Sequence, residues 1–332
     1  MPWNDGFMTP SDLERSNVSI RSLGLLLVDG FSLMSYASVI EPYRAANTLA
    51  GRTLYRWAHI SIDGAPSHAS NGATILADHA VGQPVSCDTL FVFAGGDPTG
   101  FDEPRTFAWL RQIAGGGTVI GGISAGPYLL ARAGLLGGYR ATMHWEHRTA
   151  FGEAFPMITQ EPGLFVIDRR RLTCAGGMAG MDLALELIER EQGHALAAQV
   201  SDWFIHGEPR VADRPQRLSL RDRYGIANDR VLKVLAHMEA NVEEPSSRET
   251  LARIAGVSVR QLERLFGRHL GETVNDGYMR VRLALAEQLL RSTGLSITNV
   301  AITSGFKSCS HFSRAYKQRY GRAPTEARRR PA

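Results

Sequence analysis

Ser124 and His144 are the residues of this sequence best placed for chemistry. Ser124 follows the apolar segment 119–123 and precedes a helical pattern, and His144 comes twenty residues later. A serine at a strand-to-helix turn can be a nucleophile, because its hydroxyl points above the sheet while amides at the helix start stabilise an oxyanion. It also needs a general base, and His144 could serve. The sequence identifies no acidic residue to orient His144, so an amidase or hydrolase is one hypothesis and a binding pocket without chemistry is the other.

The segments around Ser124 predict the sheet that would position it. Short apolar runs alternate with helical patterns, which is typical of a parallel sheet covered by helices on both faces. In such sheets binding sites form where strands end and helices begin, and the paired glycines Gly95 and Gly96 mark a second junction of this kind. We expect strands at 23–28, 57–62, 89–94 and 118–120, and helices at 34–49 and 106–114.

The carboxy-terminal part contains an internal repeat. Residues 251–271 align with residues 300–321, and each copy reads as a short helix, a turn that begins at a glycine, and a second helix. This order is that of a helix-turn-helix unit. Two capping boxes, Ser246 with Glu249 and Ser258 with Gln261, predict helix starts near 247 and 259. A helical pattern from 278 to 292 predicts a connecting helix.

Two helix-turn-helix units on one rigid helix suit DNA, because successive major-groove faces recur about every 34 Å along one side of the duplex. The second helix of each unit is predicted to enter the groove. Arginine and glutamine can read base edges there, while serine and lysine more often hold phosphates. The predicted DNA-binding residues are Ser258, Arg260, Gln261, Arg264, Arg268, Ser308, Ser310, His311, Arg314 and Lys317.

Composition divides the chain into an acidic and a basic part. The 332 residues carry a net charge of +4, but residues 1–206 hold 14 Lys and Arg against 20 Asp and Glu, whereas residues 207–332 hold 23 against 13. A basic domain suits phosphate neutralisation. With 44% hydrophobic and 21% charged residues, the chain as a whole is neither disordered nor fibrous. The apolar runs are too short for a membrane helix and no secretory signal is recognisable, which predicts a cytoplasmic protein.

The three cysteines, Cys87, Cys174 and Cys309, show no paired spacing. Neither a disulfide framework nor a zinc site is predicted, and no metal or cofactor is expected. Cys309 is expected to be a packed small residue.

The segment 304–317, followed by residues 321–324, resembles the signature of the AraC/XylS family of bacterial transcription regulators. The resemblance covers about the last 100 residues. It implies promoter DNA and RNA polymerase as partners.

The segment 129–145 resembles the DJ-1/PfpI group, whose flavodoxin-like domain has the class I glutamine amidotransferase fold. In enzymes of this group a cysteine occupies the position of Ser124, a histidine lies about where His144 does, and an acidic residue lies where this sequence has Ser35. Both reactive positions are therefore serine, with Glu41 a turn or more beyond Ser35. The loss of the thiol favours a sensor of small molecules over an enzyme.

The two resemblances predict the domain organisation. We expect a disordered tail at 1–18, a DJ-1/PfpI-like ligand-sensing domain at 19–205, a linker at 206–226 and an all-α domain with two helix-turn-helix motifs at 227–332. The fold class is therefore α/β with a parallel sheet, followed by an all-α domain.

The stretch 30–42, with 44–47 and 55–57, resembles regulators of glycine betaine, carnitine and arginine catabolism, which implies a small nitrogenous ligand. A quaternary ammonium would be recognised by aromatic faces. Arginine would instead need a carboxylate, which Glu41 or Asp97 could supply, and packing in the core remains the alternative for any one ring. The predicted ligand-binding residues are Phe31, Ser35, Tyr36, Glu41, Gly96, Ser124, Ala125, Tyr128, His144 and Trp145.

The sequence therefore predicts a cytoplasmic, homodimeric transcription activator rather than an enzyme. Its acidic domain would bind a quaternary amine or an amino acid in a degenerate amidotransferase-like pocket, and its basic domain would bind promoter DNA. An amidase or hydrolase that uses Ser124 and His144 is the alternative.

Overall fold

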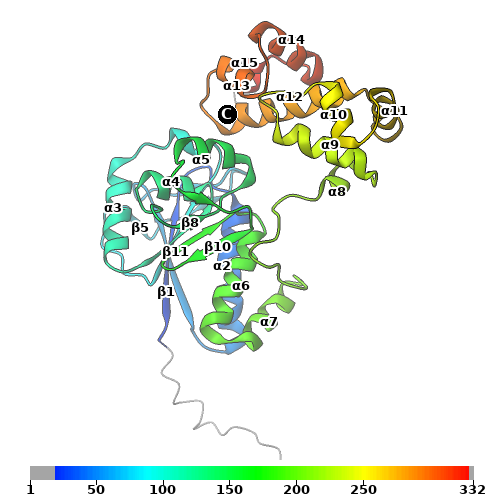
Figure 1. The fold of residues 1–332 in the computed structure, drawn as a ribbon. Coiled ribbons are helices and arrows are strands. Elements are labelled where there is room, and N and C mark those ends of the chain that lie inside the picture. Colours follow the sequence, from blue (N-terminus) through cyan, green and yellow to red (C-terminus); the bar gives the residue numbers. More distant parts are fainter. Residues whose placement is uncertain (1–18, 329–332) are drawn as a thin grey trace, which may run out of the picture.

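The computed structural model describes residues 19–328. The predicted disordered tail at 1–18 lies outside the described residues. Figure 1 shows an α/β domain and, beyond an extended connection, a second domain made of helices. Within the described residues no helix is both long enough and apolar enough to cross a membrane.

A seven-stranded sheet forms the centre of the amino-terminal domain, in the order β10-β11-β7-β6-β1-β2-β5. All neighbouring strands are parallel except β10 and β11. Two short pairs, β3 with β4 and β8 with β9, lie outside this sheet. The strands are β1 (Arg21–Leu27), β2 (Tyr55–Ser61), β3 (Ser67–His68), β4 (Thr74–Ile75), β5 (His79–Ala80), β6 (Thr89–Ala94), β7 (Val119–Ser124), β8 (Arg140–Ala141), β9 (Thr159–Gln160), β10 (Phe165–Asp168) and β11 (Arg171–Cys174).

Helices cover both faces of the sheet, because its central strands are apolar on both sides. In β6, Phe91 and Phe93 pack into the core under α2, α6 and α7, whereas Leu90 and Val92 pack into the core under α3, α4 and α5. The helices are α2 (Leu33–Ala50), α3 (Pro104–Gly115), α4 (Gly126–Arg132), α5 (Arg148–Ala154), α6 (Ala179–Gln192) and α7 (His194–Trp203), with the short 3₁₀ helices η1 (Pro98–Gly100) and η2 (Trp145–His147). The predicted parallel α/β fold is confirmed.

Glycines in β7 allow close packing at the centre of the sheet. The sequence predicted that this strand ends at residue 120, before the Gly121-Gly122 pair, but it continues to Ser124. A Cβ atom on Gly121 would lie 2.5 Å from the Phe91 ring, and one on Gly122 would lie 2.7 Å from the Pro127 nitrogen. These glycines are therefore required for packing and do not break the strand.

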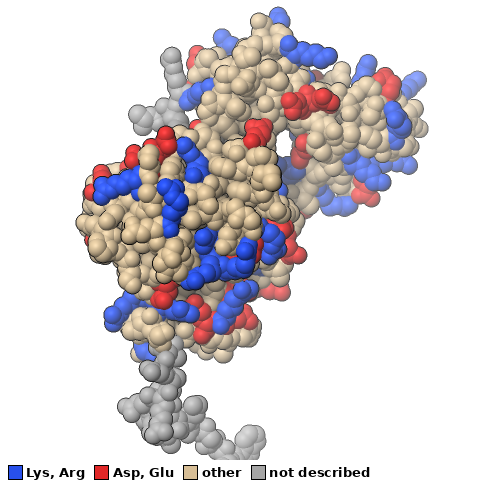
Figure 2. Space-filling model, turned by 60° about the vertical axis from the view of Figure 1, so that its left-hand side comes forward, with Lys and Arg blue, Asp and Glu red and all other residues tan. Residues whose placement is uncertain are grey.

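The second domain contains the two predicted helix-turn-helix units. α10 (Arg248–Ala255) and α11 (Val259–Leu270) form the first, α13 (Ile297–Thr303) and α14 (Cys309–Tyr320) form the second, and α12 (Val274–Ser292) connects them. The remaining helices are α8 (Leu220–Tyr224), α9 (Asp229–Ala240) and α15 (Pro324–Arg328). Figure 2 shows Lys and Arg side chains protruding from the outer edges of this domain.

One of the two predicted capping boxes is present. The Ser258 side chain accepts a hydrogen bond from the Gln261 amide, and the Gln261 side chain accepts one from the Ser258 amide. The other prediction is wrong by one residue, because Ser247, not Ser246, caps α10. Ser246 instead bonds through its hydroxyl to His237 and through its amide to the Tyr278 hydroxyl.

The segment between the domains is hydrogen-bonded to the sheet domain. Gln216 Nε2 donates to the carbonyls of Met143 at 2.9 Å and Gly163 at 2.8 Å. At the start of this segment, His206 and Arg210 contact the fully buried Asp182 carboxylate of α6. The carboxylate accepts a 2.7 Å hydrogen bond from Arg210 Nη2 and lies 3.0 Å from His206 Nε2. These contacts hold residues 206–216 along the first domain.

We predict that Asp182→Ala lowers the free energy of unfolding by about 3 kcal/mol, because it leaves the half-buried Arg210 without its carboxylate partner. Urea unfolding followed by far-UV circular dichroism measures this. Asp202→Ala, which removes an exposed carboxylate from α7, is the control and is expected to change the value little. Equal stabilities of the two variants would contradict the role of Asp182.

Candidate functional site

Ser124 stands at a strained turn between β7 and α4. Its φ of 62° lies in the left-handed region, which costs an L-residue roughly 1–2 kcal/mol. Strain of this kind is concentrated at binding and catalytic sites. The elbow predicted from the sequence is therefore present in its backbone geometry.

Ser35 and Ser124 lie on either side of Gly176. A Cβ atom added to Gly176 would lie 2.6 Å from Ser124 Cβ and 2.8 Å from Ser35 Oγ. Ser35 Oγ accepts a 2.7 Å hydrogen bond from the Gly177 amide, and Ser38 Oγ donates a 2.6 Å bond to the Gly177 carbonyl. The position that the resemblance assigns to an acidic residue is thus occupied by a serine that bonds the loop before α6.

His144 reaches Ser124 through the backbone. The His144 amide donates to the Ser124 carbonyl at 3.3 Å. Among residues 19–328, no hydrogen bond joins the Ser124 hydroxyl to the His144 ring, and the Ala125 amide donates to the Ala94 carbonyl at 3.2 Å. Neither the activated hydroxyl nor the oxyanion-binding amide that acyl transfer needs is in place.

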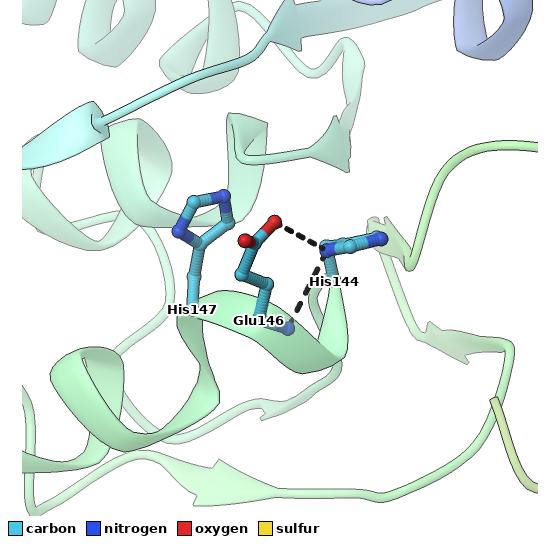
Figure 3. Close-up of side chains that lie close together, drawn as sticks. All are labelled: His144, Glu146 and His147. Carbon is cyan, nitrogen blue, oxygen red and sulfur yellow. Dashed lines mark hydrogen bonds and ion pairs between the residues drawn. The ribbon is translucent and has the colours of Figure 1, made fainter. Parts of the chain in front are cut away.

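Glu146 lies between His144 and His147 (Figure 3). The His144 Nδ1 atom accepts a 3.4 Å hydrogen bond from the Glu146 amide and lies 3.9 Å from Glu146 Oε2. The sequence had identified no acidic neighbour of His144, and Glu146 is that neighbour. Because His144 caps η2, the cluster has a structural role at this turn.

Among the described residues, the same three side chains form the candidate group of metal ligands. Their candidate ligand atoms lie within 4.8 Å of one another. Zinc bonds of 2.0–2.2 Å in a tetrahedral site would place ligand atoms about 3.4 Å apart. The cluster would have to contract around an ion before it could hold one.

Burial controls the charge of this cluster. It lowers the pKa of His144 below the ordinary 6.5, and it raises the pKa of Glu146, an effect that Arg291 partly opposes. For both groups the loss of solvent is the largest effect on the pKa. His144 is therefore expected to be neutral at neutral pH.

The four predicted aromatic rings do not form one cage. Phe31 and Tyr36 pack edge to face, 6.0 Å between centroids, on the side of the sheet covered by α2. Tyr128 is buried on the opposite side, against Phe155. Trp145 faces the second domain, where it lines a cavity. Because α2 and α4 cover opposite faces of the sheet and η2 faces the second domain, the rings are distributed over three places.

Two neighbours of Tyr36 were not predicted. The Tyr36 hydroxyl lies 2.8 Å from His59 Nε2, and His59 Nδ1 lies 3.3 Å from Asp78 Oδ2. No motif in the sequence connects these residues: Tyr36 lies on α2, His59 lies on β2, and Asp78 directly precedes β5, which pairs with β2. Of the other predicted residues, Glu41 pairs with Arg44 at 2.7 Å on the surface of α2, and Gly96 is exposed at a φ of 63°.

All ten predicted DNA-binding residues are exposed, while Leu262 and Phe266 of α11 and Phe312 and Tyr316 of α14 are buried. Each second helix thus has one face in the core and one in solvent. Four of the ten residues also have local contacts. Ser258 and Gln261 form the capping box, Ser308 caps α14, and His311 packs on Phe306.

Six predicted residues remain directed outward without such contacts: Arg260, Arg264 and Arg268 on α11, and Ser310, Arg314 and Lys317 on α14. Their three- and four-residue spacing places each set on one helix face. Cys309 was expected to be packed, but it is exposed at the first position of α14. This surface can contact phosphates and base edges.

We predict that the His144 imidazole titrates below pH 6.5, because protonation would place a charge in a partly desolvated site. The unfolded chain would then bind the proton more readily, so stability is retained above pH 6.5 and falls as the pH drops toward the folded-state value. Histidine ring signals in NMR, assigned with His144→Gln, report the midpoint. A midpoint at or above 6.5 would contradict the effect of burial.

Comparisons with known proteins agree with this architecture. A family model described as the DJ-1/PfpI family matches residues 24–190, and one described as a helix-turn-helix domain matches residues 251–330. The HTH-type transcriptional regulator CdhR of Pseudomonas aeruginosa is 43% identical over 91% of this chain and 90% of its own length. The HTH-type transcriptional regulator GlxA of Rhizobium meliloti is 41% identical over 94% and 97%.

A crystal structure of an AraC family transcriptional regulator from Pseudomonas putida, 27% identical, covers 55% of this chain and 99% of its own with a TM-score of 0.50. Both domains and their order therefore agree with the resemblances seen in the sequence. The chain belongs to the AraC family of helix-turn-helix transcription regulators that carry a DJ-1/PfpI-like amino-terminal domain.

Proposed function

We propose that this protein is a cytoplasmic transcription activator that binds promoter DNA through α11 and α14 and responds to a small nitrogenous metabolite. The observation that carries the DNA part is the pair of outward faces with Arg264 and Arg314 at equivalent positions. Both helices present arginines to solvent while their aromatic residues fill the core. Such faces suit two successive major grooves.

The amino-terminal domain is the proposed sensor. The elbow backbone persists while the groups required for acyl transfer are absent or otherwise bonded, which supports binding without turnover. Residues 144–147 begin at His144, whose amide is hydrogen-bonded to the Ser124 carbonyl of the elbow. The same segment reaches the DNA-binding domain, where Gln288 Nε2 donates to the Glu146 carbonyl at 2.6 Å. A ligand that changes this segment would favour one arrangement of the two domains, as regulation requires.

We further propose a role in amine or amino-acid catabolism, a homodimer, and contact with RNA polymerase at the promoter. Exposed apolar side chains at the end of α7, Trp203 at 50% and Ile205 at 94%, are candidates for a dimer contact. Sedimentation equilibrium of the full chain tests the dimer.

We predict that Arg264→Ala and Arg314→Ala each weaken promoter binding by about 1–3 kcal/mol, because each removes a side chain that can bond a base edge. Fluorescence anisotropy at fixed salt, with labelled promoter DNA and an unrelated duplex, separates base reading from phosphate contact. Arg230→Ala, an exposed arginine of α9 outside the repeats, is the control. Wild-type affinity in both test variants would remove these residues from the interface.

The hydrolase alternative gives a different result. We predict that the purified full chain releases no ammonia from glutamine, because Ser124 lacks an activating base and the Ala125 amide is already bonded. A coupled ammonia assay measures this beside Ser124→Ala. Ammonia release that disappears in Ser124→Ala would show that the domain is an enzyme.

A further inference from the structure

A cavity of about 520 Å³ lies between the two domains and is open to solvent. Trp145 and Glu146 line it from the first domain, Arg217 lines it from the connecting segment, and Glu287 and Arg291 line it from α12. A volume of this size is within the usual range for small-molecule sites. In Figure 2 the facing surfaces of the two domains leave an open space beside acidic side chains.

The Arg217 guanidinium lies over the Trp145 ring, which is the aromatic side chain at this end of the cavity. Its guanidinium carbon lies 4.6 Å from the centroid of the Trp145 ring, a cation–π arrangement. Among the described residues Arg217 makes no hydrogen bond or ion pair. Burial also lowers its pKa, which means that the surroundings disfavour its charge. With no hydrogen bond or ion pair among the described residues, the guanidinium is held in place by its contact with the Trp145 ring.

Arg217 belongs to the segment that connects the two domains, so its contact with Trp145 joins that segment to the first domain. Its neighbour Gln216 is anchored to the Met143 carbonyl, and the Glu146 carbonyl accepts the bond from Gln288. Trp145 lies between these two points. Displacement of the group on the face of Trp145 would therefore affect both the connecting segment and α12.

The cavity lining carries both charges: Arg223 and Arg291 pair there with Glu239 and Glu287, and two further carboxylates come from the first domain. Glu146 and Glu153 bring carboxylates from the first domain to the cavity wall. A tryptophan face with nearby carboxylates is the environment that recognises organic cations, with more stabilisation when the cation is desolvated. Arg217 fills that role in the structure.

We propose that the cavity between the domains is an effector site for a small organic cation, which takes the place of the Arg217 guanidinium over Trp145. This proposal rests on the proposed ligand-controlled function and specifies its binding site. Displacement of Arg217 detaches the connecting segment from the Trp145 ring and alters how the DNA-binding domain is held. Quaternary ammonium compounds and free arginine share the required charge, and the test separates them.

The proposal predicts opposite effects for the two partners. Trp145→Leu removes the ring and is expected to weaken binding at least about tenfold, whereas Trp145→Phe keeps a poorer ring and weakens it about threefold. Arg217→Met removes the internal competitor and is expected to tighten binding by about threefold to tenfold. Misfolding cannot produce such a gain.

Isothermal titration calorimetry of the full chain with choline, glycine betaine, carnitine and L-arginine measures these affinities. The neutral carbon isostere of choline, 3,3-dimethyl-1-butanol, tests the need for charge and is expected not to bind. Arg221→Met, whose arginine pairs with Asp229 outside the cavity, is the matched control for Arg217→Met and is expected to bind as the wild type does.

Several results would overturn the proposal: no binding by any of the cations at millimolar concentration, unchanged or weaker binding in Arg217→Met, or binding lost in Ser124→Ala and retained in Trp145→Leu. The last result would place the effector at the elbow and leave the proposed function intact. A cation that binds as predicted without changing promoter affinity would instead contradict the proposed function.

Discussion

Residues 142–147 are hydrogen-bonded at once to the elbow, to the connecting segment and to the DNA-binding domain. The His144 amide bonds the Ser124 carbonyl, Gln216 bonds the Met143 carbonyl, and Gln288 bonds the Glu146 carbonyl. The loop carbonyls of Met143 and Glu146 accept hydrogen bonds from the side chains of Gln216 and Gln288. A small shift of the loop therefore affects both the connecting segment and α12. The loop thus contacts the sheet domain, the connecting segment and α12, and the proposed signal from the sheet domain would pass through it.

The elbow explains how an enzyme-like fold can serve as a receptor. The backbone at Ser124 is strained, with a φ of 62° at the end of β7. Chemistry would need further groups in place, and here Ser35 bonds the Gly177 amide while the Ala125 amide bonds Ala94. The fold keeps the polar turn at Ser124, and the proposed role of the domain is to bind a ligand without transforming it.

The sequence predicted what local patterns encode. Alternating apolar runs predicted the parallel sheet, Ser258 with Gln261 predicted the start of α11, and the internal repeat predicted two helix-turn-helix units. Contacts between distant residues carry no such pattern. Arg217 on Trp145, Gln288 at Glu146, and His59 beside Tyr36 could not be predicted, because they depend on how finished elements pack. The arrangement of the four candidate rings could not be predicted for the same reason, since Phe31 and Tyr128 lie in cores on opposite faces of the sheet.

We propose that the orientation of the DNA-binding domain follows the state of the 142–147 loop. Electron–electron distances in the full chain report this orientation, with one spin label on the exposed Cys309 of α14 and one on Gln112→Cys, an exposed position of α3, after Cys87→Ser. A bound effector is expected to shift the distance distribution between the labels. An unchanged distribution, under conditions in which the same effector alters promoter affinity, would contradict it.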